Sequence, residues 1–250
     1  MKKKLSLILA SIMALSVSVY SFASASETQV IPVDSGKIES GYVYLNGVPI
    51  KENEVIEVTE ENQDEIISKF GIEKPSEGAK LQTIRVVNTD PRGSREFLQE
   101  DNESVNPQNI FGFKLTKGTP QYIDGWTEIA RAKHFCTKAK GQSCNGVEIT
   151  VSANENVAVE VQTSLSVGVK EFVAAEFGRS LNESVGVSTS VMVPMNIPGQ
   201  KTGIVVGYPV YKSTFCQVYQ KGIFGDTYLG GASMLEPSKS SIVTMDWIQG

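Results

Sequence analysis

Apolar and polar residues alternate along two long stretches of the chain, residues 157–169 and 181–193. The odd positions of both stretches are mostly apolar, and the even positions are small or polar. A period of two predicts β-strands, because a helix would scatter the odd positions around its circumference. We therefore predict one long amphipathic hairpin, whose two arms are joined by the apolar connector at residues 171–179.

Shorter patterns predict further elements on both sides of this hairpin. Asn46-Gly47 between two apolar runs predicts a β-hairpin over residues 42–58, because this pair suits a type I′ turn. Thr59 followed by two glutamates predicts a helix that begins there and ends at Gly71. Additional strands are predicted at residues 81–88, 202–206, 208–211, 215–219 and 241–247.

The predicted fold class is mainly β. We expect an elongated antiparallel sheet or sandwich that contains the long hairpin, together with a small N-terminal α+β portion. A polar stretch at residues 89–108 suggests the boundary, so the expected parts are residues 26–105 and 106–250. Arg92 and Arg95 in this stretch suggest proteolytic activation there.

Residues 1–25 have the pattern of a signal peptide. Three lysines precede an apolar run, and Ala23-Ser24-Ala25 matches a cleavage site, so secretion with cleavage after Ala25 is expected. The alternative is an uncleaved anchor, since the run is about long enough to cross a bilayer. Without the three leader lysines, 20 of the 23 basic residues remain against 28 acidic ones, a formal charge of about −8. This charge argues against nucleic-acid binding.

The cysteines and the histidine limit the available chemistry. Cys136 and Cys144 flank a polar segment with Gly141, so we expect a disulfide across a hairpin tip and a buried, unpaired Cys216. The alternative use of these thiols is zinc binding, but their spacing fits no zinc pattern. His134 is the single histidine, and no nucleotide-binding or hydrolase motif is present. We therefore expect no enzyme activity, no cofactor and no metal, although a carboxylate pair is not visible in a single sequence.

Two interpretations of the long hairpin follow from its composition. It is either the central hairpin of a permanent sandwich or an element that enters membranes, with valines toward lipid and small polar residues on the other face. The connector is then either a buried helical turn or the apolar tip that enters first. The candidate membrane-facing residues are Val157, Val159, Val161, Leu165, Val167, Val169, Phe172, Phe177, Leu181, Val185, Val187, Val191 and Val193.

A family resemblance agrees with the membrane interpretation. The Val/Ser alternation, the segment Ala175-Glu176-Phe177-Gly178, Val193-Pro194 and the strand at residues 207–211 resemble the β module of aerolysin-like pore-forming proteins. The chain is also similar to uncharacterised small secreted proteins of Gram-positive bacteria. The resemblance implies a protein that binds a target membrane or cell-surface receptor, forms a homo-oligomeric ring and inserts the hairpin. The chain is short for this family and lacks an aromatic-rich sugar-binding lobe.

The sequence thus favours a secreted, non-enzymatic protein of the aerolysin-like type. The alternative is a secreted or envelope-associated soluble binding protein with a permanent β-sandwich. An extracellular hydrolase is a third hypothesis, and it would require a cluster of carboxylates.

Overall fold

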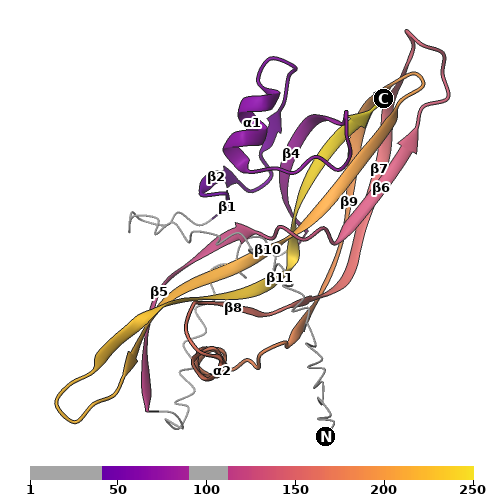
Figure 1. Ribbon diagram of the computed structural model, residues 1–250. Helices are drawn as coiled ribbons and strands as arrows, with labels where there is room; N and C mark the ends of the chain where they lie inside the picture. The colour runs from indigo at the N-terminus through magenta and orange to yellow at the C-terminus, as the bar shows by residue number, and fades with distance from the viewer. Residues whose placement is uncertain (1–40, 90–111) are drawn as a thin grey trace, which may run out of the picture. The chain divides into compact units, whose positions relative to one another are not determined.

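A nine-stranded sheet and a separate two-stranded ribbon form most of the regular structure in this computed structural model, which describes residues 41–89 and 112–250 (Figure 1). The sheet has the order β2-β1-β5-β10-β11-β4-β3, with β6 also beside β10 and β8 also beside β11. The ribbon is β7-β9. The mainly β fold class is therefore confirmed.

The sheet strands are β1 (Tyr42–Leu45), β2 (Val48–Lys51), β3 (Val55–Glu57), β4 (Lys80–Asn88), β5 (Phe113–Asp124), β6 (Ala130–Phe135), β8 (Glu160–Gln162), β10 (Thr202–Gln220) and β11 (Thr227–Gln249). The ribbon strands are β7 (Ser143–Ala158) and β9 (Ser184–Pro198), and the helices are α1 (Gln63–Phe70) and α2 (Val167–Glu176).

The antiparallel hairpin β10–β11 forms the centre of the sheet. The sequence predicts three strands within β10, and this prediction is wrong because the strand continues through Pro209. The register against β11 shifts between Pro209 and Tyr211, where β10 also changes its other neighbour from β6 to β5. A proline is tolerated at such an irregularity, since it donates no hydrogen bond to the ladder there. In the same way, the strand predicted at residues 241–247 is part of the longer β11.

The N-terminal hairpin is confirmed for β1 and β2 only, because β3, which was predicted to continue it, pairs with β4, and the helix begins later than predicted. Asn46 and Gly47 have φ angles of 47° and 78°, as a type I′ turn requires. The residue that precedes α1 is Asn62, and its side-chain Oδ1 accepts a hydrogen bond from the Thr59 N–H at 2.7 Å. Residues 59–62 therefore form a turn and Thr59 is not the helix cap. The helix ends at Gly71 in the left-handed conformation, as predicted.

The strands of residues 42–88 belong to the same sheet as β5, β6, β8, β10 and β11. β1 pairs with β5 in parallel, and β4 pairs with β11 in antiparallel orientation. All described residues belong to one compact unit. The predicted signal peptide, the predicted cleavage site and residues 90–108 of the predicted boundary, with Arg92 and Arg95, lie outside the described residues.

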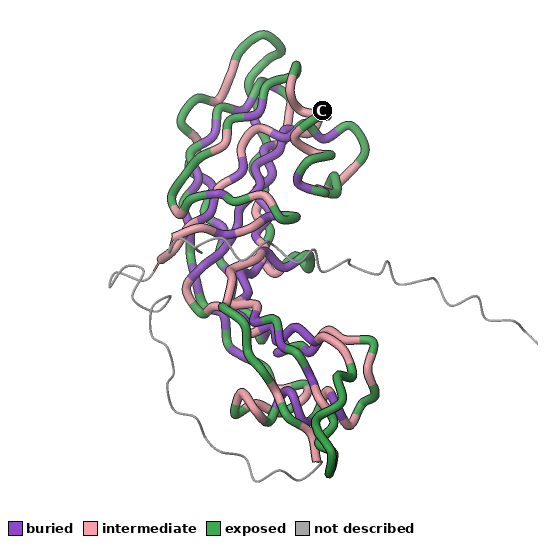
Figure 2. Tube along the Cα trace, turned by 90° about the vertical axis from the view of Figure 1, so that its left-hand side faces the viewer, coloured by how far each residue is buried: buried purple, intermediate pink, exposed green. Residues whose placement is uncertain are grey.

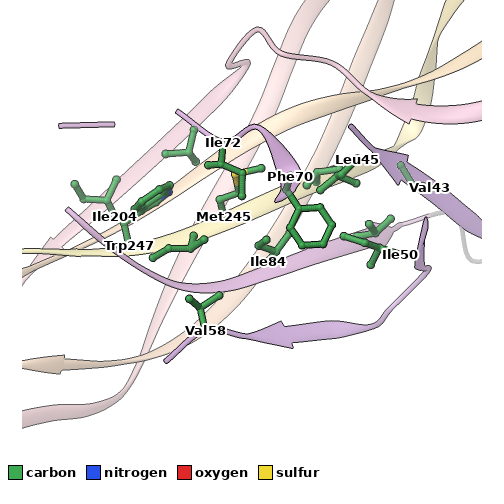
Figure 3. Close-up of a cluster of buried hydrophobic side chains, with 14 of the residues drawn as sticks. Val43, Leu45, Ile50, Val58, Phe70, Ile72, Ile84, Ile204, Met245 and Trp247 are labelled. Carbon is green, nitrogen blue, oxygen red and sulfur yellow. The ribbon is translucent and has the colours of Figure 1, made fainter. Parts of the chain in front are cut away.

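Side chains cover both faces of the sheet where β10 and β11 run beside β4 and β6. One face packs against α1 and the first hairpin, with Trp247 and Phe70 among the buried side chains (Figure 3). The other face packs against the β7–β9 ribbon. Residues 241–248 are consequently all buried, which explains why this part of β11 lacks a simple alternation of polar and apolar residues.

Candidate functional site

The β7–β9 ribbon is an amphipathic hairpin whose strands pair with each other and, among the described strands, with no third one. Its register places Ile149 opposite Val193, Val151 opposite Val191 and Val157 opposite Val185. Residues of β9 alternate strictly between exposed and buried over its whole length. Figure 2 shows how buried and exposed residues are distributed along the chain. The ribbon therefore has one apolar face and one polar face.

The apolar face of the ribbon is buried against β6, β10 and β11. Ile149, Val151, Val193 and Ile197 pack there with Ile242 and other side chains of the sheet. Burial of apolar area stabilises this arrangement by roughly 25 cal/mol per Å². The ribbon thus lies on the sheet through side-chain packing and shares no strand pairing with it.

The exposed face of the ribbon has small polar side chains and almost no charge. Ser152 and Ser190 face each other across the two strands, with their Oγ atoms 2.9 Å apart. Glu148 is the one charged residue on this face of β7, and Met192, which is 58% exposed, is the one large apolar residue on this face of β9. Glu155 lies opposite Val187, on the valine side of the ribbon, although it is itself exposed, and β9 has no charged residue. The exposed residues of the ribbon include Thr150, Ser152, Asn154, Asn156, Ser184, Ser188, Ser190 and Asn196. A solvated sheet face usually has more lysine and glutamate, so this composition is unusual for a surface strand.

The first arm of the hairpin differs from the predicted one. The prediction of a strand over residues 157–169 is wrong beyond Gln162, because α2 begins at Val167. Helix formation buries Val169, Phe172, Val173 and Ala174 together against β10 and β11, and an exposed strand would leave half of them in water. The true first arm is β7, whose alternation from Ile149 to Ala153 the sequence displays and our prediction missed.

The predicted membrane-facing residues are nevertheless mostly buried. Those with buried side chains are Val157, Val159, Val161, Val169, Phe172, Val185, Val187, Val191 and Val193. Leu165, Phe177 and Leu181 are half-buried, and Val167 is 65% exposed. The connector is thus a helical turn packed on the sheet, which was one of its two interpretations.

Polar contacts attach residues 159–183, the segment between β7 and β9, to the sheet. Arg179 pairs with Glu236 of β11 at 3.0 Å and with Glu183 at 2.8 Å. Lys117 of β5 donates to the Glu176 carbonyl oxygen at 2.8 Å, and its ammonium lies 4.0 Å from the centre of the Phe177 ring. These groups are partly exposed, so each contact contributes modestly, and their loss would leave mainly apolar packing to hold the segment.

The register of the ribbon continues one step into the same segment. The Val159 N–H donates to the Glu183 carbonyl oxygen at 2.7 Å, beyond the last paired residues, Ala158 and Ser184. Beyond this bond the two segments separate. The segment after β7 forms β8, which pairs with β11, and the segment before β9 forms a turn at Asn182, which has a φ of 66°. β8 and α2 therefore interrupt a hairpin that is started by β7 and β9.

The cysteines are placed as predicted. Cys136 and Cys144 form a disulfide with a Cα–Cα distance of 5.8 Å, and Cys216 is unpaired and buried. Burial raises the pKa of the Cys216 thiol to about 12, so almost no reactive thiolate forms at neutral pH. His134 lies exposed on β6, and its neighbour Cys136 is held in the disulfide, so these two residues form no nucleophile–base pair.

Two buried carboxylates accompany the central strands. Asp246 of β11 is paired with Arg85 at 3.2 Å and accepts a hydrogen bond from Thr83, while its burial raises its pKa. Asp124 at the end of β5 is 4% exposed, and desolvation raises its pKa to about 7 although backbone N–H groups partly oppose this shift. In both residues burial disfavours the charged carboxylate relative to an exposed aspartate, and at Asp246 the contacts with Arg85 and Thr83 oppose this shift.

We expect Asp124 to make the protein less stable as the pH rises from about 4 to 7. The raised pKa means that the folded state holds a proton which the unfolded state has already lost in this range, and the loss of stability approaches about 4 kcal/mol. Asp124→Asn should therefore gain stability relative to the wild type at about pH 8 and much less at about pH 4. Urea unfolding at both pH values measures the difference, and an equal change at both would contradict it.

Within residues 41–89 and 112–250, no three His, Cys, Asp or Glu side chains gather as a metal site needs. No helix in this part of the chain is long and apolar enough to cross a membrane.

Comparison with known proteins found no matching family model, no matching curated protein and no matching solved structure.

Proposed function

We propose that this chain is a secreted, non-enzymatic protein of the aerolysin-like pore-forming type. In the proposed mechanism, copies of the chain assemble on a target membrane, and the β7–β9 ribbon leaves the sheet and enters the bilayer. The observation that carries the proposal is the ribbon itself, which pairs with no third described strand and has one apolar and one nearly uncharged polar face.

The dimensions of the ribbon suit a bilayer. Its strands have 16 and 15 residues, and about 9 to 11 tilted β residues cross the hydrocarbon core. The face now packed against the sheet would contact lipid, with Glu155 as its one charged residue within β7 and β9, and the serine-rich face would line the water-filled side. Unpaired backbone groups at the two outer strand edges would find partners on neighbouring copies, as lipid requires.

The segment at residues 159–183 supports the same mechanism. If the ribbon's register continued, Val161 would lie opposite Leu181, Leu165 opposite Phe177 and Val169 opposite Val173. These apolar pairs would extend the lipid-facing side, although α2 now uses some of them for helix packing. Arg179 and Glu183 would also lie on this side, about 13 Å apart along an extended strand, so their present ion pair would break and the two charges would oppose insertion. A period-two pattern inside a helix is explained if the segment adopts a second, extended conformation.

Release of a trapped dye from liposomes made of whole-cell lipid extract tests the proposal. We expect residues 26–250, with or without trypsin treatment, to release the dye and to form detergent-resistant oligomers on the liposomes. Failure of both under every condition would overturn the proposal and favour a binding protein whose ribbon stays on the sheet.

A further inference from the structure

The turn between β10 and β11 presents two apolar side chains to water. Ile223 is 97% exposed and Phe224 is fully exposed. Hairpin turns are normally occupied by glycine, proline and small polar residues, which suit both the backbone and the solvent. An isoleucine and a phenylalanine at this place contribute no packing to the fold, so their presence needs another explanation.

The backbone conformation of this turn depends on two glycines. The Gly225 N–H donates to the Gly222 carbonyl oxygen at 3.4 Å, which closes the turn around Ile223 and Phe224. A Cβ on Gly222 would lie 2.5 Å from the Gly225 oxygen, and Gly225 has a φ of 133°, so both positions require glycine. The last residue pair of β10 with β5 is Gln220 with Phe113, and the turn therefore extends beyond the end of β5 (Figure 1).

Other exposed apolar residues gather at the same end of the hairpin. Of the ten large hydrophobic side chains that are exposed among the described residues, half lie within residues 215–229 of β10 and β11. They are Phe215, Ile223, Phe224, Tyr228 and Leu229. Tyr228 pairs across the strands with Tyr219, and the ring centres lie 5.5 Å apart in an edge-to-face arrangement. Tyrosines just behind an apolar tip are typical of residues at a membrane–water interface.

The charge at this end is opposite to that of the whole chain. Among the described residues, Lys114 and Lys117 of β5 and Lys221 of the turn lie here with two acidic residues. Asp226 pairs with Lys114 at 2.9 Å, and the carboxyl of Glu176 interacts with Lys117 and Lys221. The full sequence has a net charge of −5, so this basic end is a local exception. Lysines next to exposed apolar and aromatic side chains complement the anionic headgroups of a lipid bilayer.

We propose that the turn at residues 221–226, called the β10–β11 tip below, is a membrane-docking site. Ile223 and Phe224 enter the boundary between headgroups and acyl chains, the two tyrosines lie at the interface, and the lysines contact anionic headgroups. A projecting turn suits a bilayer, which needs no matching pocket, better than a folded protein partner. This inference goes beyond the proposed function, because docking through the tip needs no change in the β7–β9 ribbon.

Co-sedimentation with liposomes tests the docking site separately from pore formation. The probes are vesicles of pure phosphatidylcholine and vesicles in which phosphatidylglycerol replaces part of it. We expect stronger binding to the anionic vesicles, weakened by salt, and a loss of about 10- to 100-fold in the double variant Ile223→Ser/Phe224→Ser. The variant changes two exposed side chains of a turn, so its circular dichroism should match the wild type.

A matched control comes from another exposed aromatic side chain. Trp126 is 50% exposed, and Trp126→Ser should leave vesicle binding unchanged.

Equal binding by the wild type and the tip variant would overturn the proposal. It would also be overturned if the wild type self-associated without vesicles and the tip variant did not, because the tip would then bind a second copy of the chain. Dye release is measured on the same samples, so a chain that docks without release separates failure of the proposed pore from failure of docking.

Discussion

A disulfide between positions 162 and 233 should abolish dye release, and reduction should restore it. Gln162 of β8 and Ser233 of β11 are paired in the register of these strands. Directly opposed residues of antiparallel strands lie about 4.5–5.5 Å apart at their Cα atoms, within the range that a disulfide accepts. In the oxidised variant Gln162→Cys/Ser233→Cys, residues 159–183 cannot leave the sheet, and the extended hairpin cannot form. The native Cys216 should not interfere, because its thiol is buried and protonated.

A second crosslink provides the control for this experiment. Ser152 and Ser190 face each other across β7 and β9, which stay paired both on the sheet and in the proposed membrane form. The variant Ser152→Cys/Ser190→Cys should therefore retain release when oxidised. Wild-type protein with reductant shows what reduction of the Cys136–Cys144 disulfide does by itself. Undiminished release by the oxidised 162–233 variant would show that the segment remains on β11 while membranes open, which contradicts the mechanism.

Replacement of Trp247 by alanine should cost about 3–5 kcal/mol of unfolding free energy. Its side chain has no exposed surface and packs between β10, β4 and α1, beside Ile204 and Met245 (Figure 3). Truncation leaves a large cavity, because β10 and β4 are both hydrogen-bonded to β11, with one register shift beside Trp247, and cannot move together to close it. Urea unfolding followed by circular dichroism measures the loss.

Trp126, which is half exposed, provides a matched control for the Trp247 prediction. Trp126→Ala should change stability by about 0.5 kcal/mol or less, as is usual at the surface. If Trp247→Ala does not fold, Trp247→Phe keeps most of the buried volume and should still be less stable than the wild type. Similar stabilities for Trp247→Ala and Trp126→Ala would contradict the assigned core.

The candidate site shows where prediction from sequence succeeded and where it failed. The β9 arm was predicted because four of the five odd positions from Val185 to Val193 are valine, a period of two that indicates a strand. Residues 163–169 have the same pattern and form a loop and the start of a helix. The exposure of Ile223 and Phe224 at the β10–β11 tip was not predicted. Apolar residues next to glycines do not show in the sequence whether their side chains are buried or exposed.

Four features were predictable from the sequence: the mainly β fold, the Asn46-Gly47 turn, the Cys136–Cys144 disulfide and the amphipathic character of strand β9. Each of these follows from residues close together in the chain, whose spacing or backbone preference is a local property. The tertiary structure alone decided that β7 pairs with β9, that α2 packs on β10 and β11, and that Ile223 and Phe224 remain in water. These outcomes depend on which apolar surfaces meet across distant segments, and this competition for burial has no signature in a single stretch of sequence.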